Sequence, residues 1–172
     1  MSQYGVGEIA VPDGCSVIAG RPQPELDIAI VASRFNAGIV QRLLEGAVAE
    51  LESHGMLRER VTVVLVPGAW ELPIACRHVA QAGGHHGVVA LGCVIRGETP
   101  HFDYVCAEAA RGISEAARDS GVPVTFGVVT TNTLEQAEAR AGGAHGNKGA
   151  DAAAAAVEMA ELMRTLPRGL AR

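Results

Sequence analysis

The sequence predicts a three-layer α/β/α protein built on one parallel sheet. Nearly continuous apolar runs of strand length alternate along the chain with segments of helical period. Such runs are typical of strands buried on both faces, and strand–helix alternation gives parallel strands joined by right-handed crossovers. The chain has 172 residues, the length of one ordinary domain. We therefore expect a single α/β domain.

Four apolar runs are the expected strands, at residues 26–32, 61–66, 87–95 and 122–130. The expected helices lie at residues 37–54, 71–82, 100–120, 134–141 and 148–166. For four strands in this alternation we expect the flavodoxin-like order 2-1-3-4. Sheets of this kind bind ligands outside the carboxyl ends of their strands, where helix N-termini attract anions.

The N-terminal segment differs in composition from the rest of the chain. Residues 1–25 are rich in Gly and Pro and have no helical period. We expect residues 1–14 to be a flexible extension and residues 15–172 to form the single domain. Within it, residues 15–25 are an arm, in which residues 15–19 could pair as a short strand. The first residues lack the basic start and apolar core of a signal peptide, so a cytoplasmic protein is expected.

Composition argues against several classes of partner. The net charge is -5 and the Lys and Arg residues are scattered, so nucleic acid is not an expected partner. No apolar stretch reaches the ~18 residues of a membrane-spanning helix, so no membrane association is expected. The 4 cysteines form no C-x-x-C pair and fit buried thiols better than disulfides or a metal site. Aromatic residues make up only 3% of the chain, which suggests further apolar burial between subunits of a homo-oligomer.

Aromatic side chains follow the expected strands at their carboxyl ends. Phe35 follows the first strand, Trp70 the second, and Phe102 and Tyr104 the third. In a chain with so few aromatics, this placement suggests stacking surfaces for a planar ring. The alternative is that Phe35 and Trp70 close the top of the core.

The connection after the third strand predicts an anion site. Thr99 is a candidate N-cap and Pro100 the candidate first residue of a helix whose free N–H groups could hold a phosphate. His101 follows and could face the same anion, although a lone histidine is more often a surface residue. The sequence has no G-x-G-x-x-G after the first strand and no P-loop motif. The residues alone indicate an aromatic-plus-anion site without a metal, and they leave the chemistry open.

Five motifs taken together resemble the lumazine synthase family. They occur in order at residues 34–36 (RFN), 68–73 (GAWELP), 92–105 (GCVIRGETPHFDYV), 126–133 (FGVVTTNT) and 147–149 (NKG). Some are weak singly, but the set is highly specific, and the resemblance covers about residues 16–166. It implies a transferase of riboflavin biosynthesis. Members of the family condense 5-amino-6-(D-ribitylamino)uracil with 3,4-dihydroxy-2-butanone 4-phosphate, release phosphate and water, and form 6,7-dimethyl-8-ribityllumazine in the penultimate step.

The same resemblance implies a site with two halves and no cofactor. The residues implied for the pyrimidine and ribityl half are Phe35, Ala69, Trp70, Glu71, Cys93, Val94, Ile95 and Phe126. Those implied for the phosphate half are Glu98, Thr99, Arg140 and Lys148. His101 is implied as the residue that transfers protons. Trp70 departs from the more usual Phe or other apolar residue but leaves Glu71 in register.

The resemblance also implies an assembly. Phe126 matches a position that completes the pyrimidine pocket of the neighbouring subunit, so shared active sites in a pentamer are expected. The connection at residues 142–149 is similar to that of members that build icosahedral shells, and riboflavin synthase is a candidate partner. Residues 16–19 are expected to add a strand to a neighbour's sheet.

Two other functions stay open from the sequence. One is a shell protein of the same fold that binds riboflavin or a lumazine without catalysis. His101, Arg140 and Lys148 argue against it, because a carrier would not need all three. The other is a flavodoxin-like FMN carrier, but the motif set is not that of flavodoxins.

Overall fold

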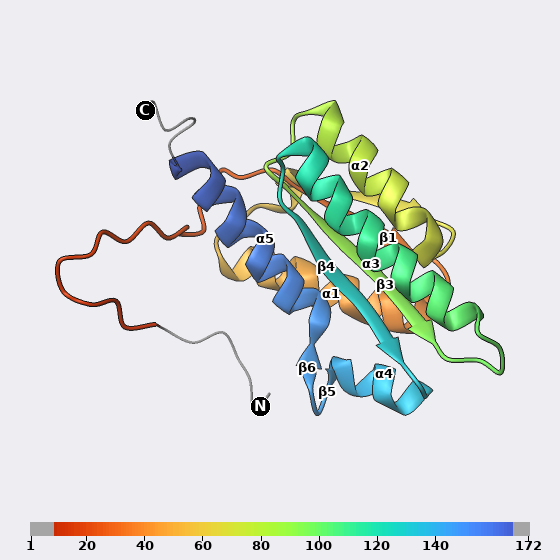
Figure 1. The fold of residues 1–172 in the computed structure, drawn as a ribbon. Helices are drawn as coiled ribbons and strands as arrows, with labels where there is room; N and C mark the ends of the chain where they lie inside the picture. Colours follow the sequence, from red (N-terminus) through yellow and green to blue (C-terminus); the bar gives the residue numbers. More distant parts are fainter. Residues whose placement is uncertain (1–8, 167–172) are drawn as a thin grey trace.

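The computed structural model describes residues 9–166, and the expected parallel sheet forms its centre (Figure 1). Its strands are β1 (Ile28–Ser33), β2 (Val61–Val66), β3 (Gly87–Ile95) and β4 (Val124–Thr131). All neighbouring pairs are parallel, and the order is β2-β1-β3-β4. The predicted order 2-1-3-4 is therefore confirmed. The carboxyl ends of β2, β1 and β3, and the connections that follow them, lie side by side.

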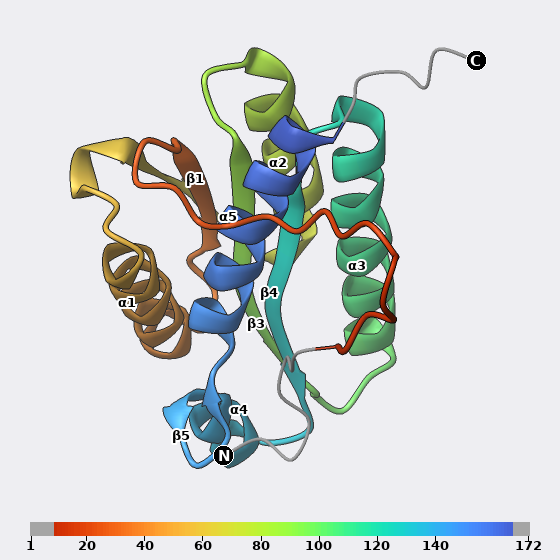
Figure 2. The ribbon, with the colours of Figure 1, turned by 90° about the vertical axis from the view of Figure 1, so that its left-hand side faces the viewer.

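Helices cover both faces of the sheet, as Figure 1 and Figure 2 show. One face carries α1 (Ala37–Ser53) and α5 (Lys148–Thr165), and the other carries α2 (Leu72–Ala82) and α3 (His101–Ser120). The three-layer α/β/α arrangement is confirmed. The short helix α4 (Leu134–Arg140) lies beyond the carboxyl end of β4.

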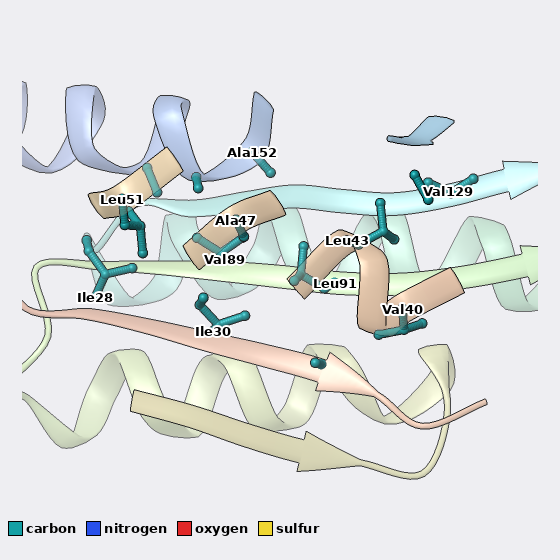
Figure 3. Close-up of a cluster of buried hydrophobic side chains, with 14 of the residues drawn as sticks. Ile28, Ile30, Val40, Leu43, Ala47, Leu51, Val89, Leu91, Val129 and Ala152 are labelled. Atoms are coloured by element: carbon teal, nitrogen blue, oxygen red, sulfur yellow. The ribbon is translucent and has the colours of Figure 1, made fainter. Parts of the chain in front are cut away.

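The larger core lies between the sheet and the layer of α1 and α5 (Figure 3). Ile30 of β1 and Leu91 of β3 pack with Leu43 and Leu51 of α1, and all four side chains are fully buried. Each such side chain contributes about 1.5–3 kcal/mol when it leaves water. The core side of α5 is mostly alanine, which lets this helix lie close to the sheet.

The edge strand β2 departs from the burial on both faces that its apolar run suggested. Every residue of β1 is buried, whereas Val63 of β2 is 43% and Leu65 is 61% exposed. Within the described residues, β2 pairs only with β1, so its outer edge carries unpaired backbone groups. An apolar run does not distinguish a central strand from an edge strand that has cover on one side only.

The helix α3 begins one residue later than expected. Pro100 occupies the cap position, and its carbonyl oxygen accepts a hydrogen bond from the backbone N–H of Asp103 at 2.9 Å. The N-cap role expected of Thr99 is therefore wrong, and no side chain caps this helix. His101 is the first helical residue.

Three short elements complete the described chain, and the sequence indicated none of them. Two are 3₁₀ turns, η1 (Arg58–Arg60) and η2 (Ala69–Glu71). The third is an antiparallel ribbon of β5 (Ala141–Gly143) and β6 (Gly146–Asn147), which joins α4 to α5. The glycine-rich connection expected at residues 142–149 is thus a defined ribbon.

Asn147 fixes the start of α5 against α1. Its Oδ1 accepts a hydrogen bond from the backbone N–H of Gly149 at 2.8 Å, which caps the helix, and its Nδ2 donates to the carbonyl oxygen of Arg42 at 2.8 Å. Gly46 of α1 leaves room for this side chain, because a Cβ at that position would overlap it.

The described part of the arm is extended chain that crosses α5 (Figure 2). It packs closely there, since a Cβ at Gly20 would overlap the carbonyl oxygen of Glu158. Residues 9–25 contain no strand, and Val17 and Ile18 are 62% and 53% exposed. The arm strand at residues 16–19 therefore stays a prediction for an assembly. None of the helices within residues 9–166 has the length and apolar character that crossing a membrane requires.

Candidate active site

A pocket of about 350 Å³ opens at the carboxyl ends of β1, β2 and β3. Its walls are the residue after β1, the η2 turn, the end of β3 and the start of α3. The lining residues are Phe35, Gly68, Ala69, Trp70, Cys93, Val94, Ile95, Gly97, Thr99, His101, Phe102 and Val105. Most of the predicted site residues therefore meet in one cavity of a single chain, at the predicted edge of the sheet.

Phe35 is held as an exposed ring at the mouth of the first strand. Its side chain is 70% exposed, although it lines the pocket. Its backbone N–H donates to the carbonyl oxygen of Pro67 at 3.0 Å. The next residue, Asn36, adopts left-handed backbone angles (φ 56°), and its Nδ2 donates to the carbonyl oxygen of Cys93 at 2.9 Å. These contacts tie Phe35 to the strands on either side, so the ring is presented rather than buried as a plug.

Trp70 and Glu71 share the η2 turn but not the pocket. Trp70 lines it and is 56% exposed. Glu71 does not line it, because its Oε2 accepts a hydrogen bond from the backbone N–H of Gly68 at 2.8 Å and so closes the turn. Both residues border a second cavity of about 550 Å³, which lies along α2 and α3. The ribityl-binding role expected of Glu71 stays a prediction.

The end of β3 supplies an apolar wall. Cys93 is 2% exposed, and Val94 and Ile95 are half-buried. Burial raises the pKa of the Cys93 thiol to about 11, so this group is neutral at pH 7. It behaves as a small apolar side chain and not as a nucleophile.

The start of α3 brings anion-binding features to the same pocket. Thr99 and His101 both line it and are exposed. The first N–H groups of an α-helix have no acceptor within the helix, and the helix dipole favours an anion beside them. Glu98 is exposed and lies outside the lining. A hydroxyl, an imidazole and the first turn of a helix therefore line the same pocket.

Three predicted site residues lie elsewhere in the chain. Phe126 is in β4, and its side chain is 45% exposed. Arg140 ends α4, where its Nη1 donates to the carbonyl oxygen of Gln136 at 3.0 Å. Lys148 begins α5, and its Nζ pairs with Oδ2 of Asp151 at 2.6 Å. None of the three lines the pocket of its own chain.

Several lining residues were not among the predicted site residues. Gly68, Gly97 and Val105 line the pocket without a role assigned from the sequence, and so does Phe102, which the sequence indicated only as one of several possible stacking rings. All four lie inside the motifs at residues 68–73 and 92–105, so membership of these motifs was the sequence feature that could have identified them as lining residues. Within residues 9–166, no group of three or more His, Cys, Asp or Glu side chains is placed to hold a metal ion.

Comparison with known proteins shows the family to which the chain belongs. The sequence model of the family described as 6,7-dimethyl-8-ribityllumazine synthase matches residues 25–164. The chain belongs to this family. A 6,7-dimethyl-8-ribityllumazine synthase of Gemmatimonas aurantiaca is 56% identical over 151 residues, which cover 87% of this chain and 92% of the relative. Those of Nitratidesulfovibrio vulgaris and Desulfovibrio desulfuricans are each 52% identical over 141 residues, covering 82% of this chain and 90% of each relative.

The lumazine synthase match contains the entire pocket. It spans all four strands and every lining residue, while residues 1–14 and most of the arm precede it. The family and the enzyme class that the five motifs indicated are confirmed.

Proposed function

We propose that this chain joins 5-amino-6-(D-ribitylamino)uracil to 3,4-dihydroxy-2-butanone 4-phosphate and forms 6,7-dimethyl-8-ribityllumazine. One observation carries the proposal: the exposed ring of Phe35 and the first turn of α3 line the same pocket. A stacking face and an anion-binding helix end are what a uracil and a phosphate ester need side by side. The relatives named above support the same reaction.

The uracil occupies the half of the pocket next to β1 and β3. Its ring stacks on Phe35, and the backbone of Cys93, Val94 and Ile95 lies along its edge. Ala69 and Trp70 border the ribityl chain. Only Oε2 of Glu71 is engaged by the η2 turn. Its other oxygen is able to accept a hydrogen bond from a ribityl hydroxyl.

The phosphate occupies the half at the start of α3. The helix N–H groups and the Thr99 hydroxyl donate to its oxygens, and Glu98 contributes through the backbone of the same loop. Arg140 and Lys148 supply positive charge. Charge-assisted hydrogen bonds from a guanidinium are well suited to a phosphate because two parallel N–H groups match two oxygens.

His101 transfers protons during the condensation. The 5-amino group of the uracil adds to the ketone, and water leaves as the C=N bond forms. Phosphate then departs by elimination, and the ribityl-bearing amine closes the second ring with loss of a second water. Each stage moves a proton, and a positioned imidazole typically accelerates such steps by about 10²–10⁴. Much of the remaining acceleration comes from holding an amine and a ketone together, since the two react with each other without further activation.

We propose further that the site is shared between neighbouring copies. The pocket is built from residues 35–105, whereas Phe126, Arg140 and Lys148 lie on β4 and the elements after it. Within the described chain the outer edge of β4 is unpaired. A copy that docks β4 and α4 beside the pocket of its neighbour would complete both halves of the site.

Mixed assemblies test the reaction and the sharing together. One variant carries Phe35→Ala with His101→Ala, and the other carries Arg140→Ala. If the halves come from different copies, about a quarter of the sites in a 1:1 co-assembled mixture are wild type, and lumazine absorbance recovers to that level. Activity no higher than that of the separate variants would contradict the sharing. A wild-type protein that forms no lumazine from the two substrates would contradict the reaction itself.

The assembly is proposed to be a pentamer that builds an icosahedral shell in the cytoplasm. The short ribbon of β5 and β6 supports the shell because it gives the α4–α5 connection a compact, fixed geometry. The 4 free thiols fit a reducing compartment. Riboflavin synthase is the proposed partner. Electron microscopy that shows only single pentamers would contradict the shell.

A further inference from the structure

Arg96 joins three elements around the loop that carries the anion-binding residues. Its backbone N–H donates to the carbonyl oxygen of Thr131 at 2.8 Å, which ties the end of β3 to the end of β4. Its Nε donates to Oδ1 of Asn132 at 3.1 Å. Its Nη2 and Nη1 donate to the two carboxylate oxygens of Asp103, at 2.7 and 3.2 Å. Asp103 lies in the first turn of α3.

The same guanidinium lies over a ring of the pocket wall. Its central carbon is 4.2 Å from the centre of the Phe102 ring, within the range of a cation–π contact. Phe102 lines the pocket, whereas Arg96 does not. One planar group therefore braces both the helix start and a wall residue from outside the cavity.

An exposed ion pair by itself contributes little to stability. The Arg96 and Asp103 side chains are 41% and 57% exposed, and pairs of this kind are screened by solvent. This pair differs from others in its position in the chain. The residues between its two members are 97–102, which include Thr99 and His101. Because Arg96 is bonded to β4 and Asp103 is bonded to Arg96, both ends of the segment are held, and the positions of Thr99 and His101 between them are restrained.

We propose that Arg96 is a positioning residue, which locks the first turn of α3 to the ends of β3 and β4 and so holds Thr99 and His101 at the pocket. The proposal rests on the proposed condensation for its functional consequence. Hydrogen bonds from Arg96 hold the pKa of Asp103 below its usual range, so the pair stays ionised at neutral pH. The contact is lost only as pH falls through that lowered value.

The test compares Arg96→Ala with Arg96→Lys and with a matched control. Arg58→Ala is the control, because Arg58 also forms an exposed two-pronged pair, with Glu52, away from the pocket. For Arg96→Ala we expect kcat/KM to fall roughly tenfold, with kcat lowered and KM for the butanone phosphate raised, since small misplacements of catalytic groups are costly. Affinity for the uracil, measured by direct titration, should not change. Arg96→Lys keeps the charge but not the planar fork, so we expect only partial recovery.

Hydrogen exchange supplies a readout that does not depend on turnover. Amides of residues 97–103 should exchange faster in Arg96→Ala than in the wild type or Arg58→Ala, while residues 35–36 should be unchanged. Should Arg96→Ala fail to assemble, Asp103→Asn keeps the shape of the partner and should show the same KM and exchange changes. Wild-type kinetics in both Arg96→Ala and Asp103→Asn would overturn the proposal, as would a loss confined to the uracil. Absence of turnover in the wild-type protein would instead contradict the proposed reaction. The exchange data would still test whether Arg96 holds the first turn of α3 in place.

Discussion

Replacing Asn36 tests whether the turn after β1 sets the position of the stacking ring. Asn36→Ala removes the hydrogen bond to the carbonyl oxygen of Cys93, which contributes about 1 kcal/mol. It also forces alanine into left-handed backbone angles, which asparagine tolerates and which cost alanine about 1 kcal/mol more. Asn36→Gly removes the same hydrogen bond but accepts the backbone angles freely.

The two variants separate the hydrogen bond from the backbone strain. Phe35 precedes Asn36 directly, so loss of the bond should loosen the ring and raise KM for the uracil about fivefold in both variants, the equivalent of about 1 kcal/mol. The free energy of unfolding, measured at equal protomer concentration, should fall by about 2 kcal/mol in Asn36→Ala and by less in Asn36→Gly. If Asn36→Gly kept the wild-type KM, the link between this turn and the ring would be refuted.

Four further changes probe the other parts of the site and the assembly. Phe35→Ala should weaken uracil binding by about 0.5–1.5 kcal/mol beyond the lost apolar area, and an unchanged affinity would make Phe35 a structural residue. Arg140→Ala should raise KM for the butanone phosphate more than KM for the uracil, because it removes a charge-assisted contact of about 1.5–3 kcal/mol. His101→Ala should lower kcat by roughly 10² or less, since proximity supplies much of the rate. The opposite pattern, with binding lost in His101→Ala and intact in Arg140→Ala, would exchange the two assignments. Deleting residues 1–20 should loosen the oligomer, whereas deleting residues 1–12 should not, and particle mass after the longer deletion checks the arm strand.

Much of the fold followed from the sequence because its strands are apolar runs with clear breaks. The run that became β3 is buried over most of its length, and its position and neighbours were predicted. The exposure of Leu65 on β2 was not, because an apolar run carries no record of what lies beyond the sheet edge. The ribbon of β5 and β6 was not predicted, because its paired segments are too short for any periodicity to appear.

The site was predictable where residues adjacent in sequence stay adjacent in space. Thr99 and His101 lie at one helix start, and both line the pocket as expected. The contact between Asn36 and Cys93 spans 57 positions of sequence, so no local pattern revealed it. Phe126 and Arg140 do not line the pocket of their own chain, and their place in a neighbour's site stays a proposal that rests on the family resemblance.

The burial of the Cys93 thiol has a consequence for the chemical reactivity of the pocket wall. A ketone that carries a phosphate leaving group is an electrophile, and a thiolate beside it would compete with the amine of the uracil. With a pKa of about 11, only about one thiol in ten thousand is ionised at pH 7. The wall of the pocket thus contains a sulfur atom that does not act as a rival nucleophile at neutral pH, and the same protonation should protect Cys93 from alkylating reagents.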